Sequence, residues 1–527
     1  MTTFIRILAF AALFWTGIVL ADGNHHATYD IDQEKLGKVH FPVSCTPAAQ
    51  IQFDKALAML HSFWYDEAEK AFQRVISIDP GCAMGYWGIA MSLYQQLWAT
   101  TPTMEEMQRA HDALAQVQPS MIKTAREKAY LGAIAIIYPV TENGHDYSAR
   151  KLAYEQAMQQ IAEQFPDDSE ATLFYALALI SNASLDDKTF TRQKQALHLL
   201  QRILKKEPHH PGVAHYIIHS SDYPELAAAG LDAARAYTYI APAVPHALHM
   251  SSHIFVRLGL WQDVVQSNLA ACRASQEHAS DNYGDDIHYK DYLLYAYLQL
   301  GETEKARAIV QEILTTDQAH PHNTTIAYAF AAIPARFAAE RGDWHAAAGL
   351  SVHPANFPWQ QFGWCEALTH FTRGMGAART GDTDEARQSL QRLTVLRDHD
   401  YTAHQDYTAG QIEIQRLTVA AWIALAENHA EEALQLMHAA ADLEDSTEKD
   451  NVTPGSILPA RELLGELLLT LDQPAAALKE LEASLQRTPN RRNSISLAAR
   501  AAKKAGDLPR ADRYERQFQA LQYKEPG

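Results

Sequence analysis

The chain has 527 residues, of which 47% are hydrophobic, and it carries a formal charge of −18. A chain of this length can bury a large core, and its acidity excludes a general electrostatic grip on DNA or RNA. We therefore expect no nucleic-acid partner.

Residues 1–21 are typical of a secretory signal peptide. Arg6 supplies the positive charge, an apolar stretch follows as far as Leu20, and Ala21 suits a cleavage site. The mature protein would then begin at Asp22 in an exported, oxidising compartment, periplasmic or secreted, with no membrane span after signal cleavage. An uncleaved N-terminal anchor is the alternative interpretation.

Four cysteines allow three complete pairings. Cys45 lies just before one predicted helix, and Cys82 lies just after the antiparallel helix that follows it. A helical hairpin brings these two ends together, so we predict a Cys45–Cys82 disulfide. Cys272 and Cys365 fall in different hairpins, and we predict that both are reduced and buried.

A helical repeat pattern begins after a polar region. Segment 64–80, WYDEAEKAFQRVISIDP, resembles the second half of a tetratricopeptide repeat (TPR), in which a small residue lets two helices approach and proline stops the second. The eight-residue spacing from Phe72 to Pro80 recurs from Leu200 to Pro208. These segments predict antiparallel helical hairpins.

Further along, a turn residue is repeatedly followed five positions later by a small one. The pairs are Gly259/Val264, Gly301/Ala306, Gly342/Ala347, Gly381/Ala386, Asn428/Ala433, Asp472/Ala477 and Gly506/Ala511. The small positions recur every 34 to 47 residues, the length of one hairpin. The pattern predicts an all-α fold: an α-solenoid of TPR-like helical hairpins forming a right-handed superhelix.

The predicted organisation has six parts. They are the signal peptide 1–21, a loose N-terminal arm 22–46, N-terminal TPR-like hairpins 47–100, irregular helical hairpins 101–190, His-rich TPR-like hairpins 191–300 and C-terminal TPR-like hairpins 301–522.

Seven of the 25 histidines fall between His209 and Gly259. Two pairs, His215/His219 and His249/His253, have the i, i+4 spacing that stacks side chains on one helical face. A single helical histidine is more often hydrogen-bonded or solvated than a ligand. Because the paired spacing repeats on two neighbouring helices, we predict that the four imidazoles converge on one transition-metal ion.

Other polar residues lie on the first helices of the predicted hairpins, which line the groove of a solenoid. His246 lies near enough to replace one of the four metal ligands. The candidates for supporting the ligands through hydrogen bonds are Asp222, His288, Asp291, Glu366 and His370.

Several blocks resemble those of a bacterial exported tetratricopeptide-repeat family. They are AHYIIH (214–219), HALHMSSHIFVRLG (246–259), CAMGYWGIAM (82–91), AADLEDSTEK (440–449) and VTPGSILPARELLGELLL (452–469). The resemblance covers most of the mature chain. It implies the helical repeat fold and the histidine block, and it implies no particular reaction.

Two functions follow as hypotheses. TPR solenoids commonly bind a protein or peptide in the concave groove, here beside a site for Zn, Cu or Fe. The alternative is a metal-dependent hydrolase or oxidoreductase with its active site in that groove.

Overall fold

The structure, a computed structural model, describes residues 32–97, 101–139, 147–184, 186–277, 283–316 and 322–522, with side chains from 286 onward in the fifth range. The predicted signal peptide, 1–21, lies outside the described residues. The described residues belong to one compact unit that begins at Asp32.

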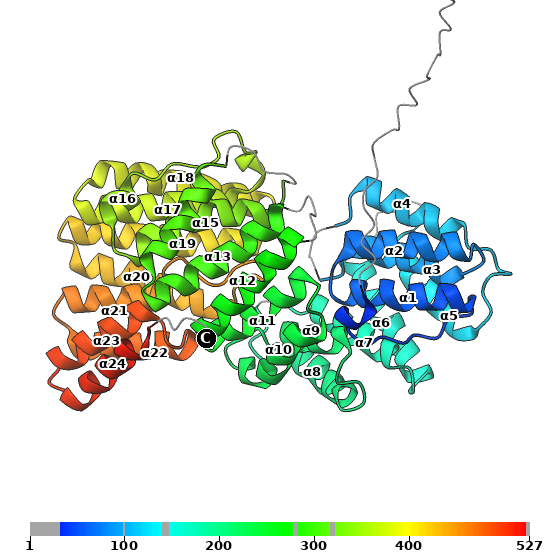
Figure 1. The fold of residues 1–527 in the computed structure, drawn as a ribbon. Coiled ribbons are helices and arrows are strands. Elements are labelled where there is room, and N and C mark those ends of the chain that lie inside the picture. Colours follow the sequence, from blue (N-terminus) through cyan, green and yellow to red (C-terminus); the bar gives the residue numbers. More distant parts are fainter. Residues whose placement is uncertain are drawn as a thin grey trace, which may run out of the picture. The chain divides into compact units, whose positions relative to one another are not determined.

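The described residues form a succession of helices joined by short turns (Figure 1). The first helices of the hairpins are α1 (Pro47–His61), α3 (Ala83–Tyr94), α5 (Ala125–Ala135), α7 (Ser169–Ser181), α9 (Pro211–Ser221), α11 (Pro245–Arg257), α13 (Tyr283–Leu300), α15 (Thr324–Glu340), α17 (Gly363–Thr380), α19 (Asp406–Ala426), α21 (Ala460–Thr470) and α23 (Arg492–Lys504). The second helices are α2 (Tyr65–Ile78), α4 (Met104–Ala115), α6 (Tyr147–Gln164), α8 (Thr191–Leu204), α10 (Ala227–Ile240), α12 (Trp261–Glu277), α14 (Thr303–Leu314), α16 (Trp344–Ala348), α18 (Thr383–Thr402), α20 (Ala430–Ser446), α22 (Pro474–Arg487) and α24 (Leu508–Ala520). Two 3₁₀ helices, Gln33–Lys35 and Trp359–Gln361, complete the secondary structure of these ranges.

The turn residues predicted from the sequence adopt left-handed backbone angles. The residues are Gly259, Gly301, Gly342, Gly381, Asn428, Asp472 and Gly506. At Gly381, φ is 88°, a conformation that costs glycine little and that ends a helix cleanly. Five positions on, the small residue is fully buried in six of the seven pairs and nearly so at Ala511, so each hairpin closes tightly.

The first helices also pack on one another from α7 through α9, α11, α13, α15 and α17 to α19. Each hairpin therefore buries one side against the next, the defining contact of a solenoid. The described residues contain no β-strand. The predicted all-α solenoid of TPR-like hairpins is confirmed, and it places α9, α11 and α13 in a row.

The region expected to be a loose arm is packed in its described part, residues 32–46. Leu36 and Phe41 are buried, and the Phe41 ring lies 5.1 Å from that of Tyr130. The amide of Lys38 donates to the carbonyl of His209. The sequence looked polar overall, but these few apolar side chains are enough to fix the segment on the helices.

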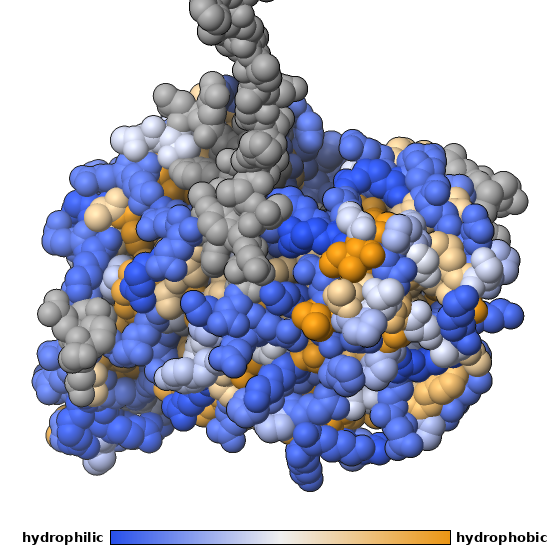
Figure 2. Space-filling model, turned by 45° about the vertical axis from the view of Figure 1, so that its right-hand side comes forward, coloured by the Kyte–Doolittle hydropathy of each residue, from blue (hydrophilic) through white to orange (hydrophobic). Residues whose placement is uncertain are grey.

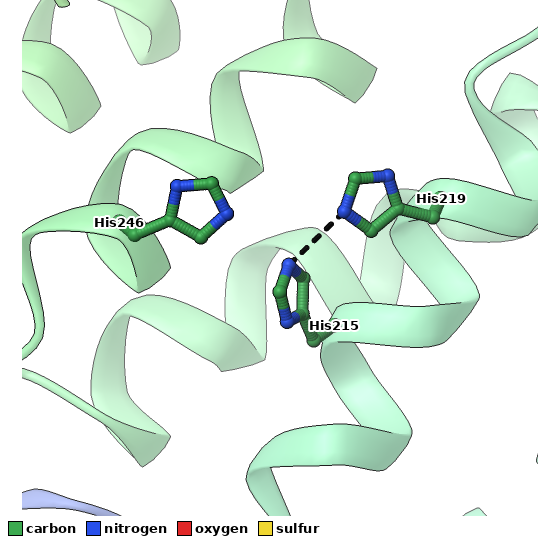
Figure 3. A group of neighbouring side chains, drawn as sticks. All are labelled: His215, His219 and His246. Carbon is green, nitrogen blue, oxygen red and sulfur yellow. Dashed lines mark hydrogen bonds between the residues drawn. The ribbon is translucent and has the colours of Figure 1, made fainter. Parts of the chain in front are cut away.

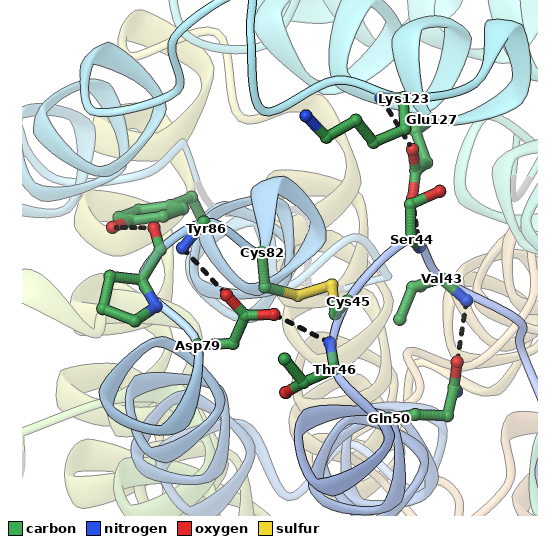
Figure 4. Close-up of a disulfide and its surroundings, with 12 residues drawn as sticks. Val43, Ser44, Cys45, Thr46, Gln50, Asp79, Cys82, Tyr86, Lys123 and Glu127 are labelled. Carbon is green, nitrogen blue, oxygen red and sulfur yellow. Dashed lines mark hydrogen bonds between the residues drawn. A yellow bond between two sulfur atoms is a disulfide. The ribbon is translucent and has the colours of Figure 1, made fainter.

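A disulfide joins Cys45 to Cys82 at a Cα–Cα distance of 5.0 Å (Figure 4). Beside it, the amide of Thr46 donates to the carboxylate of Asp79 at 2.8 Å, so two links cross this hairpin. Cys272 and Cys365 are free and buried.

The face in Figure 2 is mostly hydrophilic, with small separate hydrophobic patches, as a net charge of −18 suggests. None of the helices in the described ranges is both long and apolar enough to cross a membrane.

Candidate metal centre

A row of buried histidines runs across the neighbouring first helices α9, α11 and α13. His215 and His219 come from α9, His249 and His253 from α11, and His288 from α13. Each is buried, and the most exposed of them, His288, is 8% exposed. The solenoid aligns these helices, so side chains far apart in the sequence meet on one side of the row.

The four predicted ligands do not meet at a single point. They divide between two groups whose ligand atoms lie within 4.8 Å of one another: trio 1 (His215, His219, His246) and trio 2 (His249, His253, His288). The prediction of one four-histidine site is therefore corrected. The reason is that His246, one turn before His249, faces α9, while α13 adds a third imidazole to the α11 pair.

In trio 2 the hydrogen bonds fix which ring nitrogen carries the proton. The Nδ1–H of His249 donates to Oδ1 of Asn268 at 2.7 Å. That oxygen is identified as the acceptor because the amide nitrogen of Asn268 donates to a backbone carbonyl. The Nδ1–H of His253 donates to the carboxylate of Asp222 at 3.0 Å. Both rings therefore carry their lone pair on Nε2.

The two Nε2 atoms of His249 and His253 lie 3.2 Å apart and face each other. Two lone pairs at this distance repel unless a cation lies between them. Two nitrogens bound to one tetrahedral ion at about 2.0–2.1 Å lie about 3.3 Å apart. The spacing and the ring orientations thus match two ligands of a common metal ion, with the His288 ring 4.5 Å from that of His249.

Asp222 supports this group as the sequence suggested. Although burial alone would raise it, Lys449 and Arg257 hold the pKa of Asp222 well below its usual value. Their side chains contact its carboxylate at 2.7 and 2.8 Å. The result is an ionised carboxylate that orients an imidazole, the arrangement that commonly supports a metal-bound histidine.

Trio 1 is also oriented, although less completely (Figure 3). The Nδ1–H of His215 donates to the carbonyl of His61 at 2.7 Å, so its Nε2 is an acceptor. Nε2 of His219 lies 3.1 Å from it, and the His246 ring lies 5.2 Å from the His215 ring. A proton on Nε2 of His219 would satisfy this pair, and so would a metal ion.

All six rings are held neutral at physiological pH. Burial lowers the pKa of His253, although Asp222 acts in the opposite direction. Burial first, and the neighbouring imidazoles second, hold the pKa of His215, His219, His249 and His288 well below its usual value. The same causes lower the pKa of His246 to about 3. Neutral imidazole is the form that binds metal, so the groups need no deprotonation to act as ligands.

A third group, the Glu170 network (His61, Glu170, His210), was not predicted. Glu170 accepts from Nε2 of His61 at 2.8 Å and from Nε2 of His210 at 2.9 Å. Tyr216 completes it by donating to Nδ1 of His61. Although burial alone would raise it, the imidazoles lower the pKa of Glu170. Because carboxylate oxygens accept these N–H groups, both imidazoles are held without a metal, although Nδ1 of His210 is buried with no hydrogen-bond partner among the described residues.

Three other predicted supporting residues lie elsewhere in the hydrogen-bond network. Asp291 faces Arg336 at 3.5 Å. Glu366 accepts from His370 at 3.2 Å and from Arg392. His288, predicted to support the ligands, is instead a member of trio 2. Helix position alone did not distinguish these outcomes.

The sequence did not indicate where the segment 447–459, between α20 and α21, would lie. Its Lys449 reaches Asp222, and its Thr453 carbonyl accepts from Tyr292 at 3.0 Å. Arg336 donates to the Gly455 and Ser456 carbonyls. The segment therefore covers the first helices beside trio 2, where a cavity of about 120 Å³ remains.

No protein-family model and no curated protein matches this chain. Among solved structures, a human IFIT1 dimer with PPP-AAAA is 10% identical, with 89% of each chain covered and a TM-score of 0.36. The APC/C hetero-tetramer Cut9–Hcn1 is 14% identical over 90% of this chain and 93% of the other, with a TM-score of 0.26. Likeness at this level bears on neither the site nor its ligand.

Proposed function

We propose that this helical-repeat protein binds a transition-metal ion through trio 2. The observation that carries the proposal is the pair of Nε2 lone pairs that face each other at 3.2 Å on His249 and His253. Their Nδ1–H groups donate to Asn268 and Asp222. Neither ring can therefore carry its proton on Nε2 instead without losing a buried hydrogen bond.

Elemental analysis tests this proposal. Protein purified without chelators from metal-supplemented medium should retain at least one equivalent of Cu, Zn or Fe. The double variant His249→Gln/His253→Gln should retain none at trio 2, with an unchanged circular dichroism spectrum. Wild-type protein that binds none of the three metals above a nonspecific background would refute it.

Catalysis by the bound metal is the second candidate. Three imidazoles leave one position of a tetrahedral ion open for water or substrate, as in catalytic rather than structural sites. A screen of the metal-loaded protein against ester and phosphate substrates and with reductants plus O₂ tests it, with the metal-free double variant as the blank.

We also propose export and membership in the bacterial exported tetratricopeptide-repeat family that the sequence blocks resemble. The Cys45–Cys82 disulfide supports export, because such bonds persist in oxidising compartments. N-terminal sequencing of the protein recovered from an extracytoplasmic fraction should begin at Asp22. Recovery of the full-length chain in the cytoplasm would refute export.

A protein or peptide partner belongs to the same proposal. The cavity beside segment 447–459 is lined by aromatic and charged side chains, among them Trp364, Tyr407 and Arg487, which suit a peptide side chain. A photocrosslinker at Gln411, on the cavity wall, should capture one partner, and Trp364→Ala should prevent its capture. If the protein with Trp364→Ala captures the partner as well as the protein without it, this cavity is not the partner's binding site.

A further inference from the structure

The two trios lie side by side on a shared helix. The α11 helix supplies His246 to trio 1 and both His249 and His253 to trio 2. Ring centroids across the boundary are 6.4 Å apart for His219 and His253, and 6.3 Å apart for His246 and His249. Two ions bound one to each trio would therefore be close neighbours.

We propose that the two trios bind a pair of copper(I) ions, one in each trio, and that this pair reacts with dioxygen. The inference rests on the proposed function for trio 2 and extends it to trio 1, to a particular metal and to a substrate.

The donor set restricts the metal. Six imidazoles provide nitrogen ligands only, which suit Cu, Zn, Fe and Ni better than the oxygen-preferring Mg, Ca or Mn. A ligating imidazole is neutral, so the six rings contribute no negative charge. The choice among the remaining metals then depends on how much positive charge this buried place tolerates.

The carboxylate that contacts trio 2 is already compensated by cations. Asp222 accepts from His253 and is shared with Arg257 and Lys449, so it offers little charge to balance an added ion. The cost of burying an ion rises with the square of its charge, so a monovalent ion costs about a quarter of a divalent one. Repulsion between two neighbouring ions is likewise fourfold smaller for a monovalent pair. Copper(I) meets both requirements.

The reaction with dioxygen follows from the pairing. Each copper(I) gives up one electron and becomes copper(II), and O₂ accepts both electrons to become peroxide, O₂²⁻. The O–O bond order falls from two to one, and the peroxide oxygens bind the two metals. The two ions and their ligand carry a total charge of +2 before and after the reaction. The net charge that the site must hold therefore does not increase.

Anaerobic titration of the reduced, metal-free full-length protein with copper(I), against a competing copper(I) chelator, tests the metal. We expect two copper(I) ions per chain, which a tenfold excess of Zn(II) does not displace. Admission of O₂ should then consume one O₂ for every two copper ions, and acid quenching should release one hydrogen peroxide for each O₂.

Variants of trio 1 separate this inference from the proposed function. His219→Gln should bind one copper(I) and lose the O₂ uptake, while His198→Ala, an exposed control on α8, should behave as wild type. His246→Asn serves the same purpose if His219→Gln misfolds, as judged by circular dichroism. Wild-type protein that binds one ion only, prefers Zn(II), or takes up no O₂ overturns the inference. One ion at trio 2 leaves the proposed function standing, whereas no ion at all ends both.

Discussion

Trio 2 and the Glu170 network are two buried groups of similar composition, but only trio 2 has the hydrogen-bond pattern of a metal site. Both bring three titratable side chains to within ligand distance of one another. In the Glu170 network the carboxylate accepts both Nε2–H groups, whereas in trio 2 two nitrogens face each other with no proton between them. The direction of the hydrogen bonds, rather than the crowding of histidines, thus separates a structural network from a candidate metal site.

The largest expected effect comes from removing one ligand. His249→Ala should lower metal affinity more than about 100-fold, because loss of a supporting hydrogen-bond partner alone costs about 10–100-fold. A competition titration with a chromophoric chelator measures it, with His198→Ala as the matched control. If His249→Ala and wild type bind metal with equal affinity, trio 2 is not a metal site and does not differ in this respect from the Glu170 network.

Glu170→Gln should disrupt the hydrogen bonds of the Glu170 network and leave trio 2 intact. A glutamine oxygen accepts from one imidazole, and its NH₂ faces the other N–H, so one buried hydrogen bond is lost at a cost of about 1–3 kcal/mol of unfolding free energy. Urea unfolding measures this loss. Metal content should stay unchanged, and its disappearance would make the Glu170 network a metal site.

The same variant carries a pH dependence. The pKa of Glu170 is lowered in the folded protein from its ordinary value of 4.5, so its stabilisation is complete above that pH and is lost as the pH falls further. The difference in stability between wild type and Glu170→Gln should therefore narrow as the pH falls below about 4.5. A difference that widens on acidification would contradict the assigned charge state.

Asn268→Ala tests the orientation of His249 and should have a smaller effect. With its acceptor gone, the imidazole can place its proton on either nitrogen, and metal affinity should fall about tenfold. The chelator competition used for His249→Ala measures it. An unchanged affinity would show that Asn268 does not set the tautomer.

Lys449→Met should have the smallest effect and the opposite sign. It removes a cation that contacts Asp222, so metal affinity should rise, by less than about tenfold, while stability falls because Asp222 loses a buried partner. Isothermal titration and urea unfolding on the same preparation check both signs. A fall in affinity would show that Lys449 helps to shape the site.

The sequence was sufficient to predict which helices carry the paired histidines. Spacing placed His215/His219 and His249/His253 on first helices, and the solenoid made those helices neighbours. It could not divide the rings into trios, because that depends on which turn of one helix faces which turn of the next. His288 was therefore expected to support a ligand, although it is a member of trio 2.

Hydrogen-bond direction was also beyond the sequence. Asp222 was a candidate on residue type alone, but nothing in the chain indicated that Asn268, on the following second helix, would accept from His249. Asp291 has the same residue type as Asp222 and lies on a first helix, yet it faces an arginine. Side-chain partners at this range are chosen by packing between hairpins that no local pattern encodes.

The inserted segment 447–459 has a consequence for how the array unfolds. Repeat arrays usually unfold from their ends, since each hairpin contacts only its neighbours. Here Lys449 reaches Asp222, 227 positions away, and Gly455 reaches Arg336, 119 positions away. These contacts bind hairpins far apart along the solenoid into one cooperative unit. Hydrogen exchange of α9, α11 and α15 should then follow a single opening event rather than a graded series from the termini.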